Sequence, residues 1–236
     1  MSGQAAPQTS KQIKKLSEKI IENLKNYSKL IYYTIAIFIL IMVCFFMSEN
    51  YRINKVLRQM DVYRQYITID SKLNSRDMRE KKLCDFYVAS SFRSCLGLSQ
   101  RFDYVNVEVL ASVIESGARL VWLDVFNDNM SPDAMPVVSN GLNQGNWRYT
   151  LNSVKLEDAL QKIATTAFNP GRVNNYNDPF FIALNLNVQN NLKTLNKIKR
   201  LIIKHLKNKL LPSRYGFLSK NISQVEIKEL LGKVII

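Results

Sequence analysis

The sequence predicts one membrane-spanning helix followed by a larger α/β domain. An apolar run of eighteen residues near the N-terminus contains no charged side chain. Short apolar runs alternate with helical patterns from residue 83 onward, and a polar, charged stretch separates the two regions. We therefore expect a basic N-terminal segment at 1–29, a transmembrane helix at 30–48, a stalk or linker at 49–82, and an α/β domain at 83–236.

The apolar run, LIYYTIAIFILIMVCFFM at 30–47, has the length of a bilayer span. At about 1.5 Å per residue it measures about 27 Å, close to the hydrocarbon thickness. Tyr32 and Tyr33 lie near one end, where amphipathic rings favour the interface. A buried core helix is the alternative, and a cleaved signal peptide fits less well because no small-residue cleavage site follows.

Both flanks of the run are basic. We expect residues 1–9 to be a disordered tail and residues 10–28 to form a basic amphipathic helix, suited to a membrane surface. More positive charges precede the run than follow it, which places the N-terminus on the cytosolic side by the positive-inside rule. The charges before it are Lys11, Lys14, Lys15, Lys19, Lys25 and Lys29, and those after it are Arg52, Lys55, Arg58 and Arg64.

The region after residue 83 reads as alternating strands and helices, which predicts βαβ units and a mostly parallel sheet of five strands. Gly117 is placed to end the first helix of this region. The last strand stops at Ile236 with an open edge, so we expect a protein partner or a further C-terminal half to cover it. The strands are expected at 84–90, 119–126, 135–140, 178–188 and 234–236, and the helices at 105–118, 155–168, 188–211 and 225–231.

The net charge of +14 raises the question of nucleic-acid binding. No zinc-finger, RNA-recognition or helix-turn-helix pattern accompanies the charge, so a basic face over an anionic membrane is the simpler interpretation. The single histidine, His205, lies in a lysine-rich helix where we expect a solvated face. Cys84 and Cys95 could pair or act as small buried hydrophobes, and their spacing matches no zinc motif.

Six short stretches resemble, in the same order, the X region of phosphatidylinositol-specific phospholipase C. That resemblance implies the first half of a (β/α)8 barrel, a partial TIM barrel, over about residues 83–236. The residues in these stretches are similar to divergent family members from large DNA viruses. That similarity implies that the protein lies in a host or virion membrane. The stretches are SSFRS at 90–94, GARLVWLD at 117–124, PVVSNG at 136–141, AF at 167–168, DPFFIALN at 178–185 and LLGKVII at 230–236.

The resemblance also says which residues to inspect. In the family one histidine deprotonates the inositol 2-hydroxyl and a second protonates the leaving oxygen. Those two positions hold Phe92 and Asn140 here, and neither side chain transfers protons near neutral pH. The family positions for calcium, normally Asn, Glu, Asp and Glu, read Arg93, Trp122, Asp124 and Asn185.

We therefore expect no catalytic residue, no metal and no cofactor, with the calcium site largely lost. A guanidinium at Arg93 could replace the cation by pairing with Asp124. Arg93, Arg119 and Arg148 could bind anionic headgroup phosphate, although Arg119 also suits packing and pairing inside the domain.

The sequence supports a membrane-anchored, catalytically inactive phospholipase-like scaffold or binding module, whose partners are the bilayer and anionic lipid. The alternative is a rewired phosphodiester hydrolase that uses Asp124 with Glu115, Asp128 or Asp133. A nucleic-acid-binding role for the lysine-rich helix is disfavoured because aromatic residues do not interleave the charges.

Overall fold

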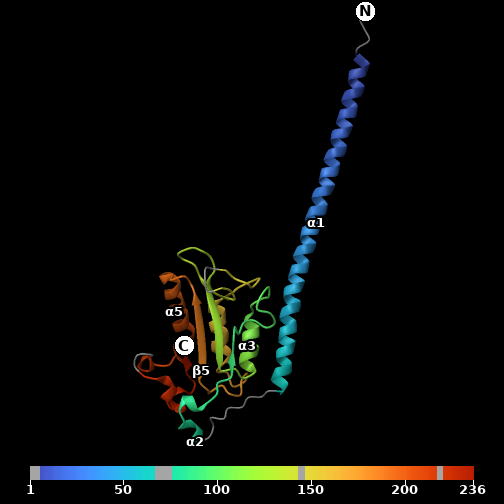
Figure 1. The fold of residues 1–236 in the computed structure, drawn as a ribbon. Helices are drawn as coiled ribbons and strands as arrows, with labels where there is room; N and C mark the ends of the chain where they lie inside the picture. Colours follow the sequence, from blue (N-terminus) through green and yellow to red (C-terminus); the bar gives the residue numbers. More distant parts are fainter. Residues whose placement is uncertain (1–5, 67–75, 143–146, 217–219) are drawn as a thin grey trace, which may run out of the picture. The chain divides into compact units, whose positions relative to one another are not determined.

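The computed structural model describes residues 6–66, 76–142, 147–216 and 220–236. It divides into two compact units, residues 1–50 and residues 51–236. The first consists of helix, and the second holds a mixed α/β domain (Figure 1).

The N-terminal helix α1 (Ala6–Tyr66) is continuous. Pro7 lies in its first turn, where proline is tolerated, and neither glycine nor proline occurs from residue 8 to residue 66. Helix therefore extends over residues 6–9, which we expected to be a disordered tail, and over the first part of the expected stalk. Residues 1–5 and 67–75 lie outside the described residues.

The expected apolar run lies within α1, and its side chains are exposed within the first unit. The candidate span covers Tyr27–Val62 and reaches a mean hydropathy of 2.6. By length and composition this helix is able to cross a membrane.

The last turns of α1 belong to the second unit. Val56 is only 5% exposed, and a Cβ atom at Gly97 would lie 2.1 Å from its Cγ1 atom. Only glycine therefore permits this close approach. Arg52 Nη1 donates a 2.8 Å hydrogen bond to the carbonyl oxygen of Phe102 and lies 3.8 Å from Asp103 Oδ1. The compact domain thus begins at Tyr51.

The domain is built on a six-stranded sheet of order β4-β3-β2-β5-β6, with β1 paired to β2. β1, β2, β5 and β6 are mutually parallel, as the alternating pattern predicted. β3 and β4 are antiparallel additions. The strands are β1 (Ser90–Ser91), β2 (Leu120–Asn127), β3 (Pro136–Ser139), β4 (Val154–Lys155), β5 (Phe180–Asn187) and β6 (Val234–Ile235).

Three details of the expected sheet were wrong. It has six strands rather than five, because β4 was not expected and Lys155 was expected to begin a helix. The segment at 136–139 returns as a hairpin against β2, because the connection from 128 to 135 is too short for a parallel crossover. Of the strand expected at 84–90, only Ser90 is in β1, and a 3-10 turn, η1 (Leu83–Asp85), occupies its start.

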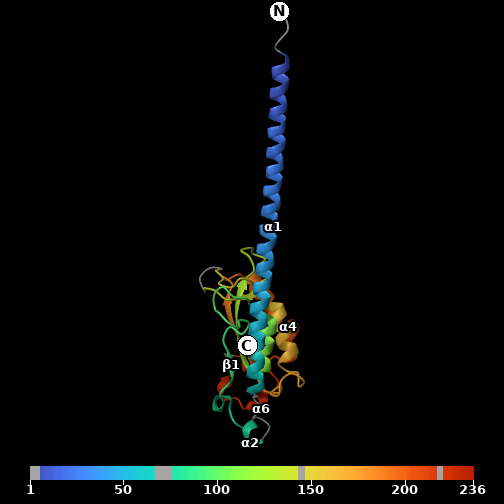
Figure 2. The same cartoon turned by 90° about the vertical axis from the view of Figure 1, so that its right-hand side faces the viewer.

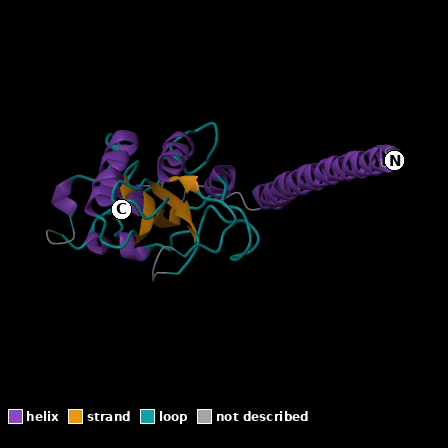
Figure 3. Cartoon of the chain, turned by 90° about the horizontal axis from the view of Figure 1, so that it is seen from above, coloured by secondary structure: helices purple, strands orange, loops and turns teal. Residues whose placement is uncertain are grey.

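Three helices follow the parallel strands in the order expected of a half barrel. They are α3 (Val107–Glu115), α4 (Leu156–Thr166) and α5 (Leu192–Leu206). α3 packs beside α4, and α4 beside α5 (Figure 2). Seen from above, the strands lie together and helices lie beside them (Figure 3). The short elements are α2 (Arg76–Arg79), η2 (Ser213–Tyr215), η3 (Ile222–Gln224) and α6 (Ile227–Leu230).

The core lies between this sheet and the three helices. Val121, Leu123 and Val125 alternate along β2 toward the helices and are fully buried. Leu110 of α3 and Leu160 of α4 meet them in one hydrophobic cluster. Each such side chain contributes roughly 1.5–3 kcal/mol by burial. Gly117, with a positive φ of 101°, ends α3 as predicted and accepts no side chain without strain.

The edge of β5 is only partly covered. β6 pairs with Phe180 and Phe181, and no other described strand continues along that edge. An apolar groove of about 560 Å³ lies here between β5 and α5, with Ile182, Leu184 and Ile202 in its lining. The open edge was expected at the last strand, and that expectation was wrong: Val234 of β6 bonds to Lys209 and Leu211 on its outer side, and the uncovered edge is that of β5 beyond Phe181.

Candidate functional site

The carboxyl ends of the parallel strands bring four of the predicted site residues together. Trp122 and Asp124 lie two residues apart on one face of β2, and Arg93 lies two residues beyond the end of β1. Asn185 is the β5 partner of Asp124 in the parallel register, so the two share one face of the sheet. The carboxyl end of a parallel sheet is where α/β folds place their functional groups.

Asp124 is the centre of this cluster, and its carboxylate accepts three hydrogen bonds. Oδ1 accepts from the indole Nε1 of Trp122 and from the amide Nδ2 of Asn185, each at 2.8 Å. Oδ2 accepts from Arg93 Nε at 2.9 Å. The side chain of Asp124 is 2% exposed. A buried carboxylate is costly unless it is paired and hydrogen-bonded, and these three donors satisfy both requirements.

Arg93 is held in place by more than its ion pair. It adopts a positive φ of 51°, which is uncommon for a residue with a side chain. Its Nη1 donates to Gln100 Oε1 at 2.7 Å, and its guanidinium lies 4.8 Å from the ring centroid of Phe92. The Phe92 ring in turn packs 5.4 Å from Trp122. The predicted Arg93–Asp124 pair is therefore confirmed.

The resemblance implies calcium at this position, and the side chains do not fit it. Calcium requires six to eight oxygen ligands. Here Arg93, Trp122 and Asn185 all direct N–H groups toward the one carboxylate. Among the described residues, no three His, Cys, Asp or Glu side chains gather as a metal site would require.

The two positions that correspond to proton-transfer histidines lie on either side of this cluster. Phe92 is 57% exposed and contacts the Trp122 ring and the Arg93 guanidinium. Asn140 is fully buried, and its amide nitrogen donates to the carbonyl of Gln100. Its amide oxygen has no partner among the described residues. The turn is completed by Gly141, where a Cβ atom would lie 1.9 Å from the carbonyl oxygen of Trp147.

The remaining two arginines of the predicted anion site lie elsewhere. Arg119, 5% exposed, donates to the carbonyl oxygens of Ala167 at 2.9 Å, Asp178 at 2.6 Å and Pro179 at 3.4 Å. Burial lowers its pKa to about 10. It therefore braces the amino end of β2. Arg148 is half-buried and donates to Ser153 and to the carbonyl of Asp128.

The carboxylates of the hydrolase alternative do not converge on Asp124. Glu115 lies at the end of α3, at the amino end of β2, 3.6 Å from Arg172. Asp128 accepts from the amide of Met135 within the hairpin. Asp133 pairs with Lys197 at 3.0 Å, and that hydrogen bond lowers its pKa. The hydrolase alternative required Glu115 to lie near Asp124. That expectation was wrong, because α3 runs from the carboxyl end of the sheet toward its amino end.

His205 and the cysteines are also placed by the structure. The His205 side chain is 14% exposed and 3.4 Å from Glu157 of α4, so the expected solvated face was wrong for this residue. Cys84 is exposed and Cys95 buried, both as free thiols. Burial raises the pKa of Cys95 to about 12, which keeps it an unreactive core residue.

Sequence reasoning missed two parts of the cluster. Gln100, seven residues beyond Arg93, fixes the guanidinium, and Trp122 acts as a hydrogen-bond donor to a carboxylate two residues away. The i, i+2 spacing of Trp122 and Asp124 on a strand was an available signal for the second contact.

The fold is that of a phospholipase C-like domain, and the carboxyl end of its sheet carries the Arg93–Asp124 ion pair. The family "Phosphatidylinositol-specific phospholipase C, X domain" matches residues 79–236. The chain belongs to that family.

Relatives and solved structures agree with this assignment. The chain is 32% identical, over 90 residues, to "1-phosphatidylinositol 4,5-bisphosphate phosphodiesterase eta-1" of Mus musculus and of Homo sapiens. The match covers 38% of this chain and 5% of each relative. The fold is similar to the crystal structures of L. pealei PLC21 and S. officinalis PLC21, each with a TM-score of 0.55. Identities are 18% and 19%, covering 67% of this chain and 19% and 18% of those chains.

Proposed function

We propose that this chain is a membrane-anchored, non-catalytic member of the phospholipase C X-domain family that acts as a scaffold or binding module. The observation that carries the proposal is the Asp124 cluster. Its three donors, Arg93, Trp122 and Asn185, stand where the resemblance implies calcium ligands, and they engage both oxygens of the one carboxylate that remains.

The loss of proton-transfer groups supports the same conclusion. A general acid or base typically contributes about 10²- to 10⁴-fold to a rate. Phe92 has no proton to exchange, and Asn140 is buried with its amide nitrogen already bonded. The only histidine among all 236 residues, His205, lies on α5 against Glu157. A mechanism that needs two histidines at this site therefore has neither of them.

The membrane anchor rests on α1. An uncharged run of eighteen residues with exposed apolar side chains requires an apolar environment, and the hydrocarbon core of a bilayer supplies one. Anchoring keeps a lipid-binding domain at high effective concentration near its ligand. Two of the relatives named above are phosphodiesterases for phosphatidylinositol 4,5-bisphosphate by their names, which makes phosphoinositide headgroups the first ligands to test.

A rewired phosphodiester hydrolase is the second candidate, because Asp124 retains a carboxylate at the carboxyl end of the sheet. Both of its oxygens already accept hydrogen bonds from cationic or amide donors. A general base must be free to accept a proton from the attacking hydroxyl. Asp124 could do so only if Arg93 moved away, which makes turnover a decisive test.

The experiment is to reconstitute the full chain into vesicles that contain phosphatidylinositol or phosphatidylinositol 4,5-bisphosphate. Turnover is measured with calcium and with chelator, next to the Asp124→Asn variant. We expect no release of inositol phosphate above protein-free vesicles, and unchanged headgroup binding when calcium is removed. Turnover that disappears in Asp124→Asn would contradict the non-catalytic assignment and support the rewired hydrolase.

A further inference from the structure

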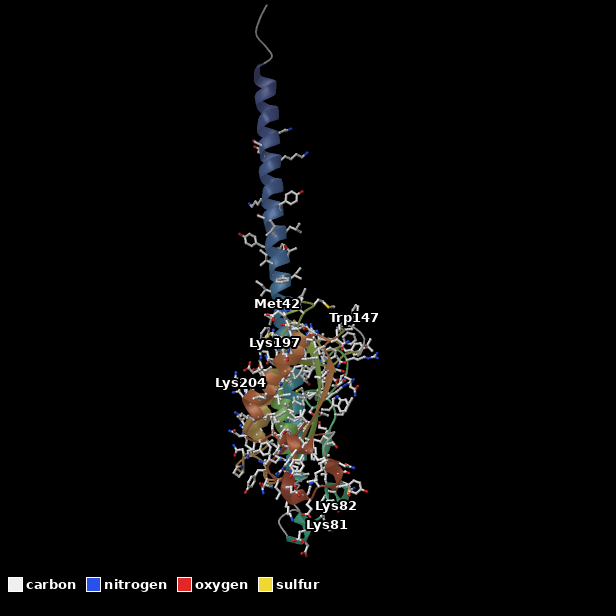
Figure 4. All side chains as sticks on the ribbon, turned by 90° about the vertical axis from the view of Figure 1, so that its left-hand side faces the viewer. Met42, Lys81, Lys82, Trp147, Lys197 and Lys204 are labelled. Carbon is white, nitrogen blue, oxygen red and sulfur yellow. The ribbon has the colours of Figure 1, made fainter. Side chains whose placement is uncertain are left out.

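The stretch from residue 179 to residue 225 has a one-sided charge. Its 47 residues contain nine lysines or arginines and no aspartate or glutamate. Most of that charge lies on α5, the longest helix of the domain after α1. In Figure 4, Lys197 and Lys204 lie along α5. Residues 179–225 therefore carry most of the net charge of the chain, and they contain no acidic residue of their own.

α5 has distinct inner and outer faces. Thr194, Ile198 and Leu206 are buried against the domain. At about 100° per residue, the exposed residues fall on an arc of roughly 140° on the opposite side. That outer face of α5 consists of Leu192, Lys193, Asn196, Lys199, Arg200 and Ile203, and it continues to Lys207 at the C-cap.

Two cations at the border of this face are already committed to the fold. Lys197 pairs with Asp133 at 3.0 Å, and Lys204 pairs with Glu157 at 2.5 Å. Within the described part of the chain, no carboxylate forms an ion pair with Lys199, Arg200 or Lys207. Lys197 and Lys204 thus bind α5 to the rest of the domain, while the cations of the outer face are available to a partner.

The outer face of α5 also carries apolar side chains. Leu192 is 73% exposed and Ile203 is 42% exposed, and both lie among the cations. Cations with interspersed aliphatic side chains suit a bilayer surface, where the apolar groups enter the headgroup layer. Nucleic acid instead rewards aromatic residues that stack on bases, and α5 contains no Phe, Tyr or Trp.

We propose that the outer face of α5 docks on the anionic headgroups of a lipid bilayer. The chain's own candidate span argues for this occupant, since it would hold the domain within reach of a bilayer at all times. The inference rests on the membrane-anchored part of the proposed function and not on the absence of turnover. Each Lys or Arg near an anionic surface strengthens association about fivefold, from about 1 kcal/mol per residue.

The test uses the full chain, labelled at one exposed cysteine and reconstituted into vesicles. Cys44→Ser and Cys84→Ser remove the exposed thiols, and Asn196→Cys places a fluorophore within the outer face. A matched chain carries the label at Gln161→Cys, on the exposed side of α4. Quenching by a headgroup-labelled lipid is compared between phosphatidylcholine vesicles and vesicles that also contain phosphatidylserine, an anionic lipid.

We expect phosphatidylserine to increase quenching at position 196 and to leave position 161 unchanged. Lys199→Gln, Arg200→Gln and Lys207→Gln together should weaken the association about a hundredfold, and raised salt should do the same. Neutralising Lys81, Lys155 and Lys220 is the control, since these exposed cations lie outside α5. That control variant should quench like the parent.

Three results would overturn the docking surface. Equal quenching in neutral and anionic vesicles is the first, and quenching that survives the triple neutralisation is the second. The third is displacement from anionic vesicles by a DNA duplex at matched ionic strength, which would assign the face to nucleic acid. Alkaline carbonate extraction, run in parallel, tests the span alone, so a failed anchor is distinguished from a failed docking face.

Discussion

An arginine lies at each end of strand β2, and the two arginines bind different kinds of partner. At the amino end, Arg119 is buried and donates to three backbone carbonyls. At the carboxyl end, Arg93 binds the carboxylate of Asp124 and has a side chain that is 22% exposed. In barrels of this type the amino ends of the strands serve stability and the carboxyl ends serve function. The same residue type thus binds backbone carbonyls at one end and a buried carboxylate at the other.

The largest effect is expected at the structural end. Arg119→Met keeps much of the apolar length but leaves the carbonyls of Ala167, Asp178 and Pro179 without their donor. We expect the free energy of unfolding to fall by about 4 kcal/mol, because each unsatisfied buried group costs about 1–3 kcal/mol. Thermal unfolding in detergent measures this. Arg148→Met is the control. If it lowered the free energy of unfolding as much as Arg119→Met, Arg119 would have no special structural role.

At the functional end, Asp124→Ala removes the common acceptor of three donors. It leaves the Trp122 indole and the Asn185 amide unpaired and the Arg93 charge uncompensated, so we expect a loss of about 3 kcal/mol. Asp128→Ala, which loses only a hairpin hydrogen bond, should cost less. Melting of Asp124→Ala at the parental temperature would show that the cluster contributes nothing to folding.

The cluster should be convertible back into a metal site. Arg93→Asn, Trp122→Glu and Asn185→Glu together place oxygen ligands around Asp124. Calcium at a hundredfold excess over its Kd should then stabilise the variant by about 2.7 kcal/mol, while the parent melts at the same temperature with calcium or chelator.

The double variant Trp122→Glu with Asn185→Glu is the matched control for that conversion. It keeps the Arg93 guanidinium beside Asp124 and should show little response to calcium. A calcium response equal to that of the triple variant would mean that Arg93 does not occupy the cation position.

Removing Arg93 alone should have a smaller effect. Arg93→Ala ends the ion pair and the hydrogen bond to Gln100, but the partly exposed position lets water reach Asp124. We expect a loss of about 1–2 kcal/mol, in the range for a hydrogen bond to a charged group. Arg101→Ala, a neighbouring exposed arginine, is the control. An unchanged melting temperature for Arg93→Ala would show that the Arg93–Asp124 pair does not stabilise the carboxyl end of β2.

The smallest effect is expected at Glu157, outside both ends of β2. The hydrogen bond from Lys204, followed by that from His205, lowers the pKa of this carboxyl. A depressed folded pKa gives stability that is present above the ordinary glutamate pKa and is lost as the pH falls through the folded value. Glu157→Gln should therefore melt below the parent at pH 7 and equal it in acid. A constant difference at all pH values would contradict this linkage.

The sequence predicted the elements of the domain better than their pairing. The helices at α3, α4 and α5 and the long strands β2 and β5 follow from periodicity and from Gly117, which are local signals. The antiparallel return of β3 and the burial of His205 depend on neighbours distant in the chain. The Arg93–Asp124 pair was predictable only because the resemblance put the two positions at one site, 31 residues apart in sequence.

By itself, the sequence determined the uncharged apolar run, the order of strands and helices, the absence of a second histidine, and the family pattern. These are properties of composition and local spacing, which need no knowledge of contacts. The tertiary structure decided that three donors share Asp124, that Arg119 serves the backbone, and that one face of α5 stays unpaired. Each depends on register and crossing geometry between segments far apart in the chain, because a hydrogen bond about 3 Å long is specified only when both partners have been placed.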